Sequence, residues 1–151
     1  MWVRPVGNAD TELPTGLTHI YYLASPIIEK GEPGRWQGAL FRSYCRFYID
    51  GLAALLQRLN AGMGKDDRAR LFIPSSAYLD GRVKGFDEYI AAKSAAEAWV
   101  DRFALANPNW QVDVPRLPQL YSDQTSGVRG QDSGKTLAYI AALLQALPAQ
   151  E

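Results

Sequence analysis

The sequence has very little cysteine and histidine, and this scarcity excludes several classes of site. Cys45 is the single cysteine and His19 the single histidine among the 151 residues. One thiol cannot form an internal disulfide or a cysteine-based metal centre, and one histidine argues against a His-rich metal site or a Ser-His-Asp hydrolase. We therefore expect no bound metal, a structural role for His19, and a reducing, cytoplasmic setting.

Net charge of one sign and long apolar runs are also missing. Sixteen basic and sixteen acidic residues cancel to a formal charge of zero, so no broad field attracts nucleic acid or an anionic membrane. No apolar run approaches the ~20 residues that span a bilayer, and the N-terminus shows no secretory signal pattern. Small molecules and other proteins are the expected partners.

What the chain does contain is enough apolar sequence for one core. With 47% apolar residues, we expect a single domain over residues 1–151. Short β-rich runs alternate with helical patterns, which predicts an α/β fold with a mostly parallel sheet of three or four strands. The predicted strands are 18–24, 71–73 and 110–114, with a further short strand at 2–6. The predicted helices are 38–59, 88–106 (capped by Asp87) and 135–147 (capped by Ser133), and 115–133 is an irregular loop.

A phenol, an amine and a hydroxyl are spaced so that they can act together. Tyr89 and Lys93 are four residues apart, which places them on one face of the predicted helix 88–106. A neighbouring ammonium lowers a phenol pKa, so we expect a tuned Tyr89. Ser76 precedes Tyr89 by thirteen residues and follows a predicted strand, at the sheet edge where parallel sheets gather ligands.

These residues resemble the short-chain dehydrogenase/reductase family, over about residue 18 to the end of the chain. The resemblance implies a partial Rossmann-like three-layer fold in which the N-terminal βαβ units are missing. It also implies roles for the three catalytic residues. Ser76 would orient a carbonyl, Tyr89 would exchange its proton, and Lys93 would hold the nicotinamide ribose and lower the Tyr89 pKa, while hydride moves to or from the nicotinamide of NAD or NADP.

Other segments are similar to the family's extended or atypical branch. Residues 19–25 resemble its fourth strand and the turn under the cofactor, and 116–121 resemble the Arg-Pro-x-x-x-Tyr turn after its sixth strand. Residues 47–52 are similar to a Val-Asn-Val-x-Gly-Thr helix segment, and 3–10 to a remnant of the third strand. The resemblance therefore implies a cofactor-binding set of Ala24, Ser25, Lys93, Arg116, Leu117 and Pro118.

Two departures from the family pattern bear on activity. Tyr48 stands where many members have a helix asparagine that holds a water of the proton relay. No glycine-rich turn follows a first strand, although such a turn brings a pyrophosphate to a helix N-terminus. The segment 130–136 resembles a P-loop but has three residues between its glycines where the motif needs four, so we interpret it as a helix start.

Three functional hypotheses follow. The leading one is the C-terminal part of an NAD(P)-dependent oxidoreductase, either a truncated product or a piece of a larger enzyme such as a ketoreductase-like region, with weak cofactor affinity alone. Its exposed sheet edge would associate with the missing half or another copy. The second is a redox-inactive module that forms dimers through helices 38–59 and 88–106. The third is an epimerase, isomerase or dehydratase of the extended branch. Substrate and the choice between NAD and NADP are not readable from the sequence.

Overall fold

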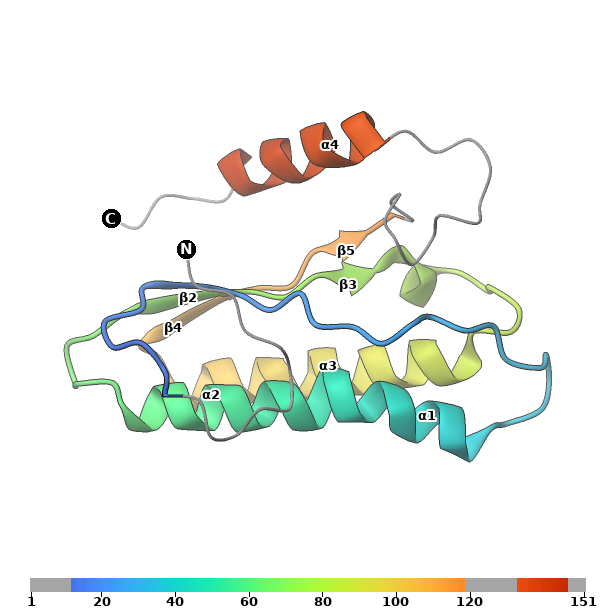
Figure 1. Ribbon diagram of the computed structural model, residues 1–151, viewed down its shortest axis with the longest axis horizontal. Coiled ribbons are helices and arrows are strands. Elements are labelled where there is room, and N and C mark those ends of the chain that lie inside the picture. Colours follow the sequence, from blue (N-terminus) through green and yellow to red (C-terminus); the bar gives the residue numbers. More distant parts are fainter. Residues whose placement is uncertain (1–11, 119–132, 147–151) are drawn as a thin grey trace. The chain divides into compact units, whose positions relative to one another are not determined.

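The computed structural model describes residues 12–118 and 133–146 of the chain (Figure 1). The chain divides into two compact units, residues 1–117 and 118–151. The strand predicted at 2–6, the third-strand remnant at 3–10 and most of the loop predicted at 115–133 lie outside the described residues.

A parallel sheet of three strands forms the centre of the first unit. Its order is β1 (His19–Tyr21), β2 (Ala69–Phe72) and β4 (Trp110–Asp113), so β1 is an edge strand. The predicted α/β architecture with a parallel sheet is confirmed. The first strand is shorter than the predicted 18–24. One further backbone hydrogen bond continues the pairing at each end: the Arg70 N–H donates to the Thr18 carbonyl (2.8 Å) and the Tyr22 N–H to the Phe72 carbonyl (2.9 Å).

A second, two-stranded parallel sheet lies beyond two prolines and was not predicted. β3 (Ser75–Ser76) pairs with β5 (Arg116–Leu117). β3 follows β2 after Pro74, and β5 follows β4 after Pro115; because proline has no N–H to donate, each strand pair is interrupted at that point. Strands of two residues are too short to show a periodic pattern, which is why the sequence indicated a loop here.

Two long helical segments cover one face of the sheet (Figure 1). The first consists of α1 (Gly38–Cys45), a π-helical turn (Arg46–Gly51) and α2 (Leu52–Ala61), and the second is α3 (Asp87–Ala106). The predicted helices 38–59 and 88–106 are confirmed, whereas the π-helical turn was not expected. Asp87 does not cap α3: the helix begins at Asp87 itself, and the preceding Phe86 provides no side-chain cap.

Apolar side chains from the sheet and the helices form the core between the two layers. Alternate residues of the strands point toward the helices, as a period of two requires. The buried residues of this core are Tyr22, Leu52, Leu56, Ala69, Leu71, Ile73, Val100 and Trp110. A second cluster is largely aromatic and packs α1 against the start of α3, and its buried members are Tyr44, Tyr48, Tyr89, Ala92 and Ala96.

The described part of the second unit is one helix, α4 (Ser133–Ala146). It agrees with the predicted helix 135–147 to within two residues. The side chain of Ser133, the predicted cap, lies outside the described residues. Within residues 12–118 and 133–146, no helix is both long and apolar enough to cross a bilayer.

Candidate active site

Ser76 lies beyond the carboxyl end of β2, where the chain turns from β3 into a short 3₁₀ helix (Ala77–Asp80). Its Oγ accepts a hydrogen bond from the Tyr78 N–H (3.2 Å), which fixes the start of that helix. Ser76 is also close enough to the Tyr89 side chain to lower the pKa of that phenol. The structure therefore brings Ser76 near Tyr89, and the catalytic roles expected of the two residues stay predictions.

Tyr89 and Lys93 both lie on α3, one turn apart, as predicted. Tyr89 is only 6% exposed, and its ring packs edge-on against Tyr44, Tyr48 and Tyr78 at centroid distances of 5.6, 5.9 and 6.2 Å. Burial raises the pKa of Tyr89, and the neighbouring Ser76 opposes this rise only in part. The Tyr89 pKa is thus raised and not lowered as the sequence led us to expect, and desolvation of the phenol is the main cause.

The Lys93 amine is engaged on two sides. Its Nζ donates a hydrogen bond to the Pro74 carbonyl (2.8 Å) and lies 4.1 Å from the centroid of the Tyr48 ring. Burial lowers the pKa of Lys93 from 10.5 to about 8, and the charge of Glu97 acts in the opposite direction. Lys93 is therefore held next to the residues that precede Ser76 in the chain.

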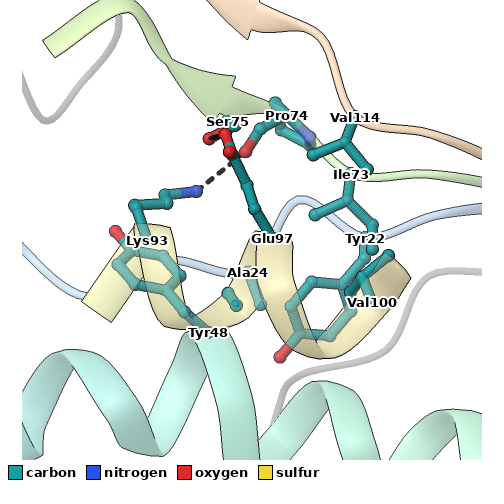
Figure 2. A pocket seen from close by; sticks show the side chains of 11 residues that line it. Tyr22, Ala24, Tyr48, Ile73, Pro74, Ser75, Lys93, Glu97, Val100 and Val114 are labelled. Atoms are coloured by element: carbon teal, nitrogen blue, oxygen red, sulfur yellow. Dashed lines mark hydrogen bonds between the residues drawn. The ribbon is translucent and has the colours of Figure 1, made fainter. Parts of the chain in front are cut away.

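A pocket opens between the sheet and α3 at the carboxyl ends of the strands (Figure 2). The cavity is small, about 20 Å³, and it is open to solvent on one side. Its walls are apolar, with Tyr22, Ile73 and Val114 on the sheet side, while the Lys93 amine and the Glu97 carboxylate line its polar end. The pocket combines apolar walls with a few polar groups, a combination common in small-molecule sites.

The residues predicted to face a cofactor have different surroundings. Ala24 lines this pocket, and Ser25 Oγ is 2.6 Å from the Tyr48 hydroxyl. Arg116 instead binds two carboxylates: a bidentate pair with Glu97 (3.1 and 2.6 Å) and a contact with Asp80. Leu117 ends β5 and is half-buried, and Pro118 follows it. The Arg116 guanidinium is thus already matched by negative charge.

Sequence reasoning missed Glu97, which joins three elements around the pocket. Glu97 accepts hydrogen bonds from Ser75 Oγ (2.5 Å) and from Arg116, and Arg116 is the main reason that the Glu97 pKa is lowered. The four-residue spacing from Lys93 to Glu97 repeats the spacing from Tyr89 to Lys93, so one face of α3 carries all three. That spacing is a signal that could have identified Glu97.

Glu88 was also missed, although it is 2% exposed. Its carboxylate accepts a hydrogen bond from the Gln37 N–H (2.5 Å), which ties the loop before α1 to the start of α3. A Cβ on Gly31 would lie 2.8 Å from Glu88 Oε2, so a side chain there would make the Glu88 carboxylate shift. Nothing in the spacing of Glu88 distinguishes it from a solvent-exposed helix residue.

Comparison with known proteins identifies the fold. No protein-family model and no curated protein matches the sequence. Among solved structures, a short-chain dehydrogenase from Salmonella enterica serovar Typhi is similar with a TM-score of 0.69 and 20% identity, over 85% of this chain and 55% of that chain. An alcohol dehydrogenase from Thermococcus sibiricus, complexed with 5-hydroxy-NADP, has a TM-score of 0.65 and 16% identity, over 87% and 57%.

A third similar structure is an alternative dihydrofolate reductase from Brucella canis complexed with NADP, with a TM-score of 0.63 and 13% identity, over 74% of this chain and 45% of that one. The chain thus has the Rossmann-like α/β fold of short-chain dehydrogenases. It spans about half the length of the structures that it matches.

Proposed function

We propose that the chain is the C-terminal part of an NAD(P)-dependent short-chain dehydrogenase/reductase that interconverts a carbonyl and an alcohol. The observation that carries this proposal is the proximity of Ser76 to Tyr89, with Lys93 one helical turn further along α3. These groups lie beyond the carboxyl ends of parallel strands, where open α/β sheets bind ligands. The similar structures with bound NADP or a derivative of it support a nicotinamide cofactor.

The protonation of Tyr89 favours the direction of reduction. Because burial raises the Tyr89 pKa, the phenol carries its proton at neutral pH. A protonated phenol donates to the oxygen of a carbonyl, while the nicotinamide, when bound, supplies the hydride. Ser76 lies close to the same phenol, so one carbonyl oxygen can be oriented by Ser76 and protonated by Tyr89. Oxidation of an alcohol would need the phenolate, which burial disfavours.

The residues around the pocket fit the nicotinamide end of a cofactor better than its phosphates. Lys93 would hold the ribose hydroxyls, and Ala24 lines the same pocket. Arg116 is bound to Glu97 and Asp80, and the sequence has no glycine-rich turn to hold a pyrophosphate. We therefore propose that this chain alone binds NAD or NADP weakly, and that the phosphates are held elsewhere in the whole enzyme.

The edge strand β1 is the proposed place of association with the rest of the enzyme. Parallel sheets are normally covered on both faces and at their edges, yet Tyr21 is 50% exposed and Leu23, just beyond the strand, is 67% exposed. This chain covers only 55% and 57% of two of the structures that it matches. We propose that the missing half of the domain, or another copy of this chain, pairs with β1.

A second candidate is a redox-inactive module. The buried phenol of Tyr89, the engaged amine of Lys93 and Tyr48 at the position of the relay asparagine all fit a copy that has lost turnover. In that case α1, α2 and α3 serve in dimer formation. The epimerase or dehydratase alternative uses the same tyrosine and lysine with a cofactor that is returned unchanged.

The experiment that tests the proposal follows the hydride itself. The full-length protein that contains this chain is incubated with NADPH or NADH deuterated at nicotinamide C4 and with a panel of ketones and aldehydes. We expect deuterium at the new carbinol carbon of at least one product. Deuterium that stays on the nicotinamide with every substrate, while the protein remains folded, would refute the reductase and favour the redox-inactive module.

A further inference from the structure

Tyr48 contacts two different partners through two different parts of its side chain. It lies in the π-helical turn between α1 and α2 and is only 3% exposed. Its ring faces the Lys93 Nζ, which is 4.1 Å from the ring centroid. Its hydroxyl is 2.6 Å from Ser25 Oγ, in the loop that follows β1. One side chain therefore links that loop to α3.

The direction of the Tyr48–Ser25 hydrogen bond follows from the number of protons available. Ser25 Oγ donates to the Pro26 carbonyl (3.0 Å). A serine hydroxyl has one proton, so in this arrangement it accepts from Tyr48, whose phenol must be the donor. Burial raises the pKa of Tyr48 and so keeps that proton on the phenol. The Tyr48 hydroxyl is thus committed to Ser25 and does not point to Lys93.

Lys93 is held by the face of the ring and not by the hydroxyl. The ring face is the electron-rich side of an aromatic group, and an ammonium placed over it is attracted most strongly where water is scarce. The Pro74 carbonyl accepts a hydrogen bond from the same amine on another side (Figure 2). Ring carbons neither donate nor accept a proton, so this contact fixes the position of Lys93 without passing a proton onward.

We infer that Tyr48 is a positioning residue: its ring holds the Lys93 amine in place by a cation–π contact, and its hydroxyl holds Ser25 by a hydrogen bond. Its catalytic meaning rests on the proposed function, in which Lys93 and Ser25 face the nicotinamide end of the cofactor. Under that function, Tyr48 stands where many family members have the relay asparagine, and its ring orients the Lys93 amine.

The first test measures the contact itself in this chain by NMR. Side-chain protons of Lys93 above the Tyr48 ring are shifted upfield, and they are assigned by their loss in Lys93→Arg. We expect the shift to remain in Tyr48→Phe, which keeps the ring, and to disappear in Tyr48→Leu. Tyr21→Leu is the matched control, since it removes an exposed tyrosine from the neighbouring strand. A folded Tyr48→Leu that keeps the shift would overturn the inference.

A measurement on the unmodified chain covers the case in which Tyr48→Leu does not fold. Nuclear Overhauser contacts between the Lys93 ε protons and the Tyr48 ring are expected, and their absence in the folded chain would overturn the inference. Neither NMR experiment depends on cofactor or turnover.

The second test uses the full-length protein and its affinity for NADPH. We expect Tyr48→Leu to weaken binding between about twofold and about thirtyfold, the range of a partly desolvated cation–π contact. Tyr48→Phe, which keeps the ring, should weaken it less than Tyr48→Leu does. Equal losses of NADPH affinity in the two variants would refute the positioning role of the Tyr48 ring. If the wild type binds neither NADPH nor NADH, the proposed function fails. The contact between the Tyr48 ring and the Lys93 amine is then decided by the NMR result alone.

Discussion

Lys93 is the residue whose charge is least favourable in its folded surroundings. Its pKa falls from 10.5 to about 8 because burial removes the water that would stabilise the ammonium. Between those two values the unfolded chain binds the extra proton and the folded chain does not. The free energy of unfolding therefore rises with pH in this window, and the cost of the buried charge is fully present below pH 8.

We predict that Lys93→Met removes this pH dependence. From pH 8 to 9.5, the stability of the wild type should increase by roughly 1–2 kcal/mol relative to Lys93→Met, measured by urea unfolding. The pH range ends at 9.5 because burial raises the pKa values of Tyr22, Tyr48 and Tyr89. Above about pH 10 these phenols ionise more readily in the unfolded chain, which lowers the free energy of unfolding. Lys84→Met, at an exposed position, is the control. Parallel pH curves for all three proteins would contradict the prediction.

Ser76 lowers the pKa of Tyr89, so its removal should raise that pKa further. We predict a higher Tyr89 pKa in Ser76→Ala, followed by the ¹³C shift of the phenol carbon during a pH titration. Ser75→Ala is a close control, because Ser75 bonds to Glu97 and not to Tyr89. A rise of equal size in both variants would show that the change comes from β3 as a whole rather than from the Ser76 hydroxyl.

At the scale of elements, the π-helical turn between α1 and α2 has a specific contact with the sheet. A π-helical turn interrupts the regular ladder of helical hydrogen bonds, and here the Phe47 carbonyl accepts a hydrogen bond from the Tyr22 hydroxyl (2.6 Å). Tyr22 continues β1, so this bond joins the edge of the sheet to the helix layer. The same turn carries Tyr48 toward Lys93.

We predict that Tyr22→Phe destabilises the chain by about 0.5–1.5 kcal/mol, the usual net worth of one intramolecular hydrogen bond. Tyr21→Phe, on the exposed neighbour, should change stability much less. Chemical unfolding monitored by circular dichroism gives both values. If the two variants are equally stable, the Tyr22–Phe47 bond does not hold the turn to the sheet.

The long helices and the central strands were predictable, and the irregular elements were not. Three- and four-residue apolar spacing over residues 38–59 requires a helix, and the β-rich runs at 71–73 and 110–114 require buried strands. The π-helical turn leaves that spacing nearly unchanged, and β3 and β5 are too short to have a pattern. Their hydrogen bonds depend on residues far apart in the sequence.

The same division holds in the candidate site. The spacing of Ser76, Tyr89 and Lys93 predicted which residues share a helix face and a sheet edge, because helix geometry fixes it. It could not predict that Tyr44, Tyr48 and Tyr78 would surround Tyr89, because those contacts come from packing between elements. The reversed direction of the Tyr89 pKa shift follows from that packing.

For the whole molecule, the account requires that residues outside this chain hold the cofactor phosphates. We predict that the 151-residue chain binds NADPH and NADH more weakly than micromolar, measured by calorimetric titration. The reason is the combination of an Arg116 bound to carboxylates and a sequence without a glycine-rich turn. Micromolar binding by the chain alone would show that it contains a complete nucleotide site.

The central claim is that the Tyr89 phenol transfers a proton during turnover, and replacing Tyr89 by Phe in the full-length protein tests it most directly. The account predicts that Tyr89→Phe lowers kcat by about 10²- to 10⁴-fold, as for loss of a general acid, with nearly unchanged affinity for NADPH. Unchanged turnover in Tyr89→Phe would contradict the account, because the phenol would then have no part in the reaction.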